Sequence, residues 1–355
     1  MSTFIPFLEG DTVDSIARVF SSAWSDNTDT LTTNHFSSSA QYNTTSATSS
    51  GAYFMEIYST NPDDNPTTAE VQYSIAYGHR KGSGSLNIAG GATGGANGFN
   101  ASKAIYTQYR NLVYGGDENQ NFSFDGHTPD DIFVLNVNRA RYKNSLRMGN
   151  QFNLTLSGSG TRNLELTDDS VTTSGSANAI RPGVGREFNL VSGSSGVRVG
   201  STNTYVTDSG SYGLVYPDAG LIVLNGDALN ASVADFGLNL SINRNSHENG
   251  LNPVRLQNSL ISGSLFQIDS QEDIASKFYF CRVRNTEFNY TTNDSFTTGT
   301  DGTLKYDSMI DNPRTYITTV GLYNDNQDLL AVAKLSQPLP KDFTKEALIK
   351  VKLDY

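Results

Sequence analysis

Short runs of β-branched and aromatic residues, each bounded by glycine, asparagine, aspartate or serine, recur along nearly all of the 355-residue chain. Such runs are typical of β-strands separated by turns. No segment of helical length has a clear 3.6-residue apolar period, and the nearest candidate, 13–24, fits an extended segment equally well because of its serine and β-branched residues. We therefore predict an all-β fold, a multi-stranded antiparallel sandwich or meander. The predicted strands lie within 52–60, 71–78, 105–115, 132–138, 152–159, 164–168, 187–193, 212–226, 264–270, 277–285 and 287–292.

Two of the predicted turns have a specific chemical basis. Between the two apolar runs of 212–226, Pro217 presets its own φ and Gly220 accepts a positive φ, which indicates a β-hairpin. The polar segment 324–328 separates two further apolar runs and predicts a second hairpin.

The C-terminal segment 346–355 alternates between apolar and polar residues up to the final tyrosine. This is the period of a half-buried strand, and a terminal strand stays ordered only if its backbone and its apolar face both find partners. The nearest partner in sequence is the hairpin Tyr316–Leu335, with 336–343 as a connector stiffened by Pro338 and Pro340. We therefore predict a C-terminal three-stranded unit that packs on the rest of the protein or on another subunit. The expected docking residues are Ile349, Val351, Leu353 and Tyr355.

Composition divides the chain into three regions. Residues 149–262 are rich in glycine, serine and asparagine, which indicates an inserted or second β-subdomain. It follows an N-terminal β region, 1–148, and precedes a C-terminal β region with the docking strands, 263–355. The low-complexity segments 37–51 and 89–98 are expected to be flexible connectors.

Charge argues against nucleic acid as a partner. The formal net charge is −11 and the isoelectric point is about 4.8, whereas a phosphate-binding surface needs excess lysine and arginine. The charge is uneven, because 132–164 contains five basic residues and no acidic one. Arg139, Arg141 and Lys143 from this segment are candidates for contact with an oppositely charged neighbour. A basic strand paired with acidic strands of the same fold explains the pattern equally well.

Motifs of the common enzyme classes are missing from the sequence, including Walker A, G-x-S-x-G, G-x-G-x-x-G and H-E-x-x-H. The four histidines are scattered over separate polar loops. The single cysteine, Cys281, excludes an intrachain disulfide and is expected to be a small buried residue of a strand.

Several acidic and aromatic residues are candidates for functional sites, but each also has a structural explanation. The segment 124–131 gathers three aspartates and His127 and could hold a cation, but its glycine and proline favour a turn. The pairs Asp168–Asp169 and Asp63–Asp64 would be glycosidase acids only if the fold placed another acid opposite them. The tyrosines of the predicted strands could stack on sugars, although strand packing explains most of them. We expect no catalytic residue, no metal, no cofactor and no enzymatic activity.

The N-terminal segment 1–11 lacks the basic region and the apolar stretch of a secretory signal, and no run of 18 apolar residues occurs. We therefore expect a protein that is made and assembled in a cytoplasm, without a membrane partner.

Five segments are similar to a family of virion structural proteins from contractile-tailed, myovirus-type cyanophages: 76–85, 106–115, 124–143, 209–225 and 312–355. The similarity is densest over 70–150 and 310–355. It implies a structural subunit in the tail or baseplate of the virion, assembled in the host cytoplasm. The implied partners are other virion proteins or further copies of the chain, and the family has no catalytic residues to transfer.

Under this hypothesis, the contacts are the basic residues Arg139, Arg141 and Lys143 and the C-terminal docking strand. Strand addition would supply affinity, and the charges would set the register. Two alternatives remain: a head, neck or decoration protein of the same virion, and a receptor-facing module that binds carbohydrate. A polysaccharide-degrading enzyme is a more distant third.

Overall fold

The computed structural model describes residues 4–31, 36–37, 54–82, 101–158, 162–199, 209–244, 251–290, 295–298 and 303–355. Antiparallel strands predominate, which confirms the all-β prediction. The chain forms two compact units: unit 1 consists of 1–18 and 273–355, and unit 2 of 19–272. The division falls inside β1 (Thr12–Ser22) and β15 (Asp269–Val283), so each of these strands has residues in both units.

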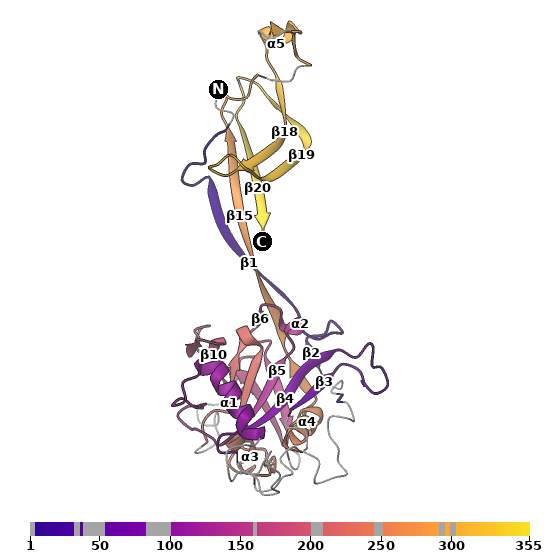
Figure 1. Cartoon of the computed structure of the whole chain (residues 1–355), viewed down its shortest axis with the longest axis vertical. Helices are drawn as coiled ribbons and strands as arrows, with labels where there is room; N and C mark the ends of the chain where they lie inside the picture. Colours follow the sequence, from indigo (N-terminus) through magenta and orange to yellow (C-terminus); the bar gives the residue numbers. More distant parts are fainter. Residues whose placement is uncertain are drawn as a thin grey trace. The chain divides into compact units, whose positions relative to one another are not determined.

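Unit 2 is built around one large antiparallel sheet, of which Figure 1 labels β2, β3, β4, β5 and β10. Its strand order is β2-β14-β7-β8-β10-β12-β13-β5-β4-β3. Two short strands, β9 and β11, also pair with β10. The strands are β2 (Thr30–Leu31), β3 (Phe54–Tyr58), β4 (Val71–His79), β5 (Asp131–Val137), β7 (Asn153–Ser157), β8 (Asn163–Asp168), β9 (Ala179–Arg181), β10 (Gly185–Ser194), β11 (Val197–Arg198), β12 (Gly213–Tyr216), β13 (Leu221–Asn225) and β14 (Leu265–Gln267).

The predicted hairpin around Pro217 is confirmed. β12 and β13 are joined by a 3₁₀ turn, η1 (Pro217–Ala219), and Gly220 has the positive φ of 63° that its position requires. A side chain at Gly220 would collide with the Tyr142 ring, because a Cβ there would lie 2.4 Å from two ring carbons. Backbone conformation and close packing therefore both demand glycine at this turn.

The strand predicted at 105–115 is wrong, because these residues belong to helix α1 (Ala101–Tyr114). Tyr106, Val113 and Tyr114 are buried on one side of the helix, which packs against β4 (Figure 1). Gly78 of β4 permits the approach, since a Cβ there would lie 3.0 Å from the backbone of Tyr106. The other helices are α2 (Arg139–Tyr142), α3 (Gly226–Asn230), α4 (Asn252–Gly263) and α5 (Ser308–Asp311). Among the described residues, no helix has the length and the apolar content needed to cross a membrane.

Two hydrophobic clusters form the core, and all their members lie in unit 2. The larger one contains Trp24, Tyr73 and Phe266, whose rings meet edge to face with centroids 5.1 to 6.1 Å apart. The second cluster includes Tyr106 of α1 and Phe122, whose rings are perpendicular. These contacts give unit 2 a hydrophobic core of its own.

Unit 1 contains two main sheets. In the first, β20 (Ala347–Asp354) pairs with β15, and β15 pairs with β1, of which the residues 12–18 and 273–283 belong to this unit. That second sheet is the hairpin of β18 (Thr315–Tyr323) and β19 (Leu329–Lys341), which confirms the hairpin predicted at 324–328. A short pair, β16 (Thr297–Thr298) with β17 (Thr303–Leu304), completes the unit. In unit 2, β6 (Ser145–Leu146) pairs with the first residues of β15.

The predicted partner of the C-terminal strand is wrong. β20 pairs with β15, from Ser276↔Asp354 to Val283↔Ala347, and the hairpin β18–β19 forms its own sheet. On one face, the apolar residues of β20 lie opposite Tyr279, Cys281 and Val283, and on the other its lysines lie over aromatic rings. β15 therefore supplies partners for both faces of β20.

The predicted connector is wrong as well, because Pro338 and Pro340 lie within β19. Proline is tolerated in a strand where its position needs no backbone donor, and within the described residues β19 pairs on one side only.

The segment 287–292 is not a strand where it is described. The structure also divides the chain elsewhere than at 148/149 and 262/263, since both positions fall within unit 2. The connectors predicted at 37–51 and 89–98 lie outside the described residues, apart from Ser37.

Candidate interaction surface

The two units differ in how many of their apolar side chains are buried. Among the described residues, 50 hydrophobic residues are buried, and four of them belong to unit 1. By contrast, the described residues include 29 large hydrophobic side chains that are exposed, and 18 of these belong to unit 1, which is the smaller unit. A folded region without a core of its own needs apolar partners from elsewhere. The four buried residues are Val283, Leu322, Ala347 and Val351.

The predicted docking strand is ordered as β20, and its burial alternates as expected. Val351 is buried opposite Tyr279, and Ile349 is half-buried opposite Cys281. Leu353 is also half-buried, whereas Tyr355 is exposed beyond the end of the strand. The docking residues therefore face β15 neighbours, apart from Tyr355. Burial raises the pKa of the Cys281 thiol, which fits a packing role.

The opposite face of β20 carries its lysines over aromatic rings. The Lys350 ammonium lies 4.0 Å from the centroid of Phe278 and 5.8 Å from that of Phe280. The Lys352 ammonium lies 2.9 Å from Asp354 Oδ1, which also accepts a hydrogen bond from Ser276 across the pair of strands. The Ser276 hydroxyl, followed by Lys352, lowers the pKa of Asp354. Cation–π contacts and this small network hold the second face of the strand.

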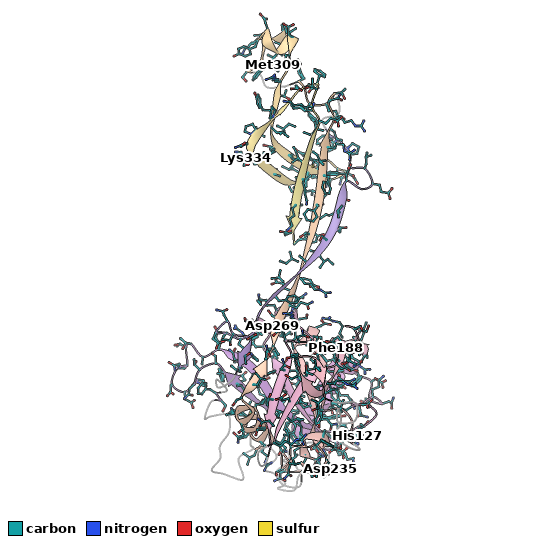
Figure 2. The ribbon with its side chains drawn as sticks, turned by 180° about the vertical axis from the view of Figure 1, so that it is seen from behind. His127, Phe188, Asp235, Asp269, Met309 and Lys334 are labelled. Carbon is teal, nitrogen blue, oxygen red and sulfur yellow. The ribbon has the colours of Figure 1, made fainter. Side chains whose placement is uncertain are left out.

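The hairpin β18–β19 carries several exposed apolar side chains of unit 1 (Figure 2, where Lys334 marks the hairpin). The Tyr323 ring lies over Gly321 and meets the Phe4 ring edge to face, at 4.9 Å between centroids. Leu330 is 68% exposed and Val332 is 57% exposed. We call Phe4, Tyr323, Leu329, Leu330 and Val332 the hairpin patch.

The size of the hairpin patch can be estimated from its exposed fractions. Five side chains of roughly 150–200 Å² that are about half exposed present ~400 Å² of apolar surface. Covering that area would contribute ~10 kcal/mol as an upper estimate, at about 25 cal/mol per Å². An area of this size is comparable to the largest apolar patch of a typical monomer, and such patches are often functional.

The basic residues predicted as contacts lie at and beside α2, not on a strand. Asn138 caps this helix by accepting a hydrogen bond from the backbone of Ala140. Arg141 lies 3.3 Å from Glu70, and Lys143 lies 3.7 Å from Glu272 and donates to Ser21. Pairing within the chain thus accounts for two of the three charges. Arg139 is exposed and lies over the Tyr142 ring.

A cleft of about 430 Å³ opens beside α2, lined by Ala23, Trp24, Asn27 and Arg141 among others. The Arg141 Nε atom is buried there without a hydrogen-bond partner. Since the guanidinium already pairs with Glu70, the cleft offers little uncompensated charge to an anionic ligand.

A buried charged cluster of unit 2 is centred on Asp131 of β5. The Asp131 carboxylate is fully buried and accepts hydrogen bonds from Tyr77 and Arg244. Arg244 also binds Asp227 at 2.5 Å, and His127 contacts the same carboxylate at 3.0 Å. Burial, reinforced by Asp131, raises the pKa of Tyr77, so its hydroxyl stays a donor. The arrangement ties β4 and β5 to α3.

The segment 124–131 forms the predicted turn. Phe124 and His127 exchange backbone hydrogen bonds, and Gly126 has a positive φ of 87°. Across the described residues, no group of three or more histidine, cysteine, aspartate or glutamate side chains is placed to hold a metal ion. His35 and His247 lie outside the described residues.

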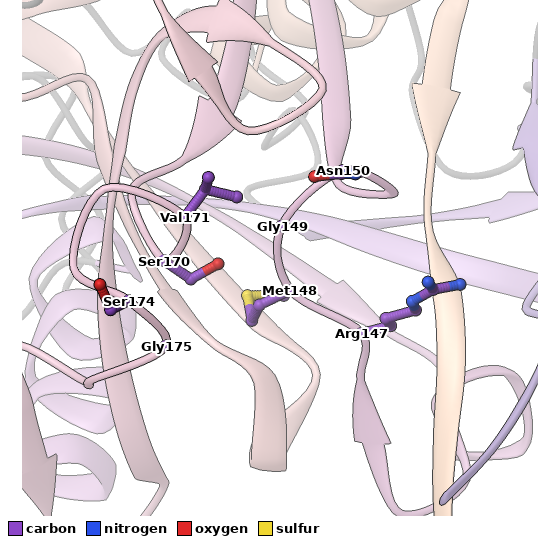
Figure 3. A pocket seen from close by; sticks show the side chains of 8 residues that line it. All are labelled: Arg147, Met148, Gly149, Asn150, Ser170, Val171, Ser174 and Gly175. Carbon is purple, nitrogen blue, oxygen red and sulfur yellow. The ribbon is translucent and has the colours of Figure 1, made fainter.

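The carboxylates of Asp168 and Asp169 stabilise local backbone. Asp168 accepts from the backbone nitrogens of Gly149 and Ser170, and burial raises its pKa. Asp169 accepts from Asn178 and Asn189. An open pocket of about 320 Å³ lies nearby, lined mostly by short side chains (Figure 3). Met148 and Arg147 also line it, and Arg147 pairs with Asp269. Asp63 lies in a turn, where its backbone nitrogen binds Asn61.

Most of the tyrosines that could have stacked on sugars belong to the core. Tyr73, Tyr77, Tyr106 and Tyr114 are buried, and burial raises the pKa of Tyr114 to about 12. By contrast, Tyr290, from the predicted strand at 287–292, is exposed. Strand and helix packing therefore account for these aromatic residues.

The sequence did not reveal the hairpin patch as a surface. Its residues alternate as those of a half-buried strand do, and that pattern does not tell which chain covers the apolar face. We compared the chain with protein-family models, with curated proteins and with solved structures, and none of the three comparisons gave a match.

Proposed function

We propose that the protein is a structural subunit of a bacteriophage particle, in the tail or baseplate, and that unit 1 joins it to its neighbours. One observation carries this proposal: unit 1 exposes 18 large hydrophobic side chains and buries four hydrophobic residues within its described part. A catalyst has no need of such a region, whereas a building block completes it by binding other chains.

Three further observations support the proposal. Unit 2 has its own core, so the exposed surface of unit 1 does not reflect a chain that is poor in apolar residues. The charged clusters of unit 2 are paired and tie backbone elements together. The resemblance of five segments to cyanophage virion proteins gives the proposal its setting, and a partner protein in the particle would cover the hairpin patch.

Paired substitutions test this function. We would introduce Leu330→Asp together with Val332→Asp in unit 1, and in a separate variant Ile180→Asp together with Val197→Asp in unit 2. The second pair is a matched control, because Ile180 is 80% and Val197 is 67% exposed. Both variants should fold, since all four side chains are exposed in the isolated chain.

Each variant would be supplied to phage that lack the native protein. Tails and heads would then be separated, and their protein content measured by mass spectrometry. We expect the control to enter tails normally and the hairpin patch variant to be excluded, with loss of infectious particles. Equal incorporation of both variants would contradict the role of unit 1, and recovery of the protein only in heads would contradict the place in the tail.

A further inference from the structure

Strand β1 is an edge strand with an open side. In the path β1-β15-β20 it has β15 on one side, and no further strand of the described residues on the other. Ten of its eleven residues are exposed, on both faces of the strand. An open edge offers unpaired backbone donors and acceptors to any strand that arrives.

The two edges of this path are protected differently. β20 carries Lys350 and Lys352, and lysines are a common protection against pairing between edge strands. β1 has neither lysine nor proline between Thr12 and Ser22. Its most exposed apolar residue, Ile16, is 69% exposed near the middle of the strand.

The sequence of β1 is complementary to itself in one register. If two copies pair antiparallel about a two-fold axis normal to the sheet at Ile16, each Ile16 lies opposite the other. Asp14 of each copy then lies opposite Arg18 of the second copy, on the same face. An axis moved to Ser15 or to Ala17 places Ile16 opposite a charged residue and makes no ion pair.

Both charges remain available for such a contact. Asp14 lies 3.5 Å from Lys277 and Arg18 lies 3.4 Å from Asp273, yet the side chains of Asp14 and Arg18 are 73% and 62% exposed. Exposed pairs of this kind contribute little by themselves and can accept a second partner. Unit 1 as a whole contains 14 acidic and 11 basic residues, so little net repulsion opposes the meeting of two copies.

We infer that β1 pairs with β1 of a second copy of this chain, with the two-fold axis at Ile16. The two copies of β1-β15-β20 then form one continuous sheet, and the interface is isologous. This inference rests on the proposed function, because it names one partner of unit 1. Pairing of the strands would supply backbone hydrogen bonds, and the two Asp14–Arg18 contacts would fix the register.

Cross-linking of the full-length protein tests the register. Cys281 would be replaced by serine, and Ile16→Cys would be added to that background. Directly opposite residues have Cα atoms about 4.5–5.5 Å apart, within the range of a disulfide. We expect a disulfide-linked dimer under mild oxidation, seen on a non-reducing gel. In the matched control, Val13→Cys, the two thiols lie about six residues apart along the strands, roughly 20 Å, and should not cross-link.

Charge reversal tests the identity of the partner. Asp14→Arg or Arg18→Asp alone should raise the dissociation constant of the dimer roughly tenfold, because each creates two like-charged pairs across the axis. The double variant should restore dimerisation, as measured by analytical ultracentrifugation. A double variant that stays at least as weak as the single ones would contradict the pairing of Asp14 with Arg18 of a second copy.

The possible outcomes separate this inference from the proposed function. Absence of the Ile16 cross-link, or equal cross-linking at Val13, would overturn the β1 pair. If the hairpin patch variant were still excluded from tails, the proposed function would stand with another partner. A specific Ile16 cross-link with normal incorporation of the patch variant would support the dimer and refute the role of the hairpin patch.

Discussion

Replacing Asp131 by asparagine should destabilise unit 2 far more than the same change at its neighbour Asp130. Asp131 is fully buried and binds Tyr77 and Arg244. Asparagine retains an acceptor for Tyr77 but removes the charge that faces the Arg244 guanidinium. Breaking a buried ion pair from one side costs about 3–5 kcal/mol. We expect about 3 kcal/mol, at the low end, because Arg244 is partly exposed and keeps Asp227 as a partner.

Asp130 provides a control one residue away. It pairs with Arg80 and Lys81, and all three side chains are at least partly exposed. Exposed ion pairs are usually worth less than 1 kcal/mol, so Asp130→Asn should change the free energy of unfolding by no more than that.

Urea unfolding followed by tryptophan fluorescence is a suitable assay. Trp24 is the only tryptophan and is buried in the core of unit 2, so the signal reports on the unit that contains Asp131. With a slope of about 3 kcal/mol per M urea, the Asp131→Asn midpoint should fall by ~1 M. Equal midpoints for the two variants would show that the buried pair contributes no more than a surface pair.

Three further predictions concern strand and helix packing. Gly78→Ala should destabilise unit 2 by about 1–3 kcal/mol in the same urea assay, because the added Cβ would meet the α1 backbone at Tyr106; an unchanged midpoint would show that α1 can move away freely. Because the pKa of Asp354 is lowered in the folded chain, its carboxylate stabilises the β15–β20 pair fully at pH values above the unfolded pKa of about 3.9. This stabilisation is lost as the pH falls through the pKa of the folded state. In an NMR titration, Ser276→Ala should raise the Asp354 pKa towards its ordinary value, and no change would refute the hydrogen bond between these residues. Deletion of 346–355 should abolish hydrogen-exchange protection in the β20-facing half of β15 and leave particles without complete tails or baseplates; normal infectious particles would contradict the docking role.

Local patterns in the sequence predicted the elements whose residues decide their own structure. The turn at Pro217 and Gly220, the hairpin at 324–328 and the alternation of β20 all follow from side-chain size, φ preference and a period of two. Helix α1 was missed because its tyrosines and valine also suit a strand, and only packing on Gly78 and Phe122 selects the helical period.

The pairing of β20 could not be predicted from proximity along the chain. Its partner β15 lies more than 60 residues away, whereas the hairpin β18–β19 is nearer along the chain. The prolines of β19 also suggested a connector, although their positions suit a strand that pairs on one side. The interaction surface was foreseen only as a strand and a basic stretch. The hairpin patch depends on which apolar faces the fold leaves open, and a single sequence does not contain that information directly.

Cys281 makes the β15–β20 contact accessible to chemistry without any engineering. It is the only thiol in the chain, lies half-buried opposite Ile349, and has a pKa that burial raises. Its rate of alkylation will therefore rise whenever the C-terminal segment detaches. If a maleimide is added at successive times to an assembling mixture, the extent of Cys281 alkylation would show when the C-terminal strand becomes stably paired.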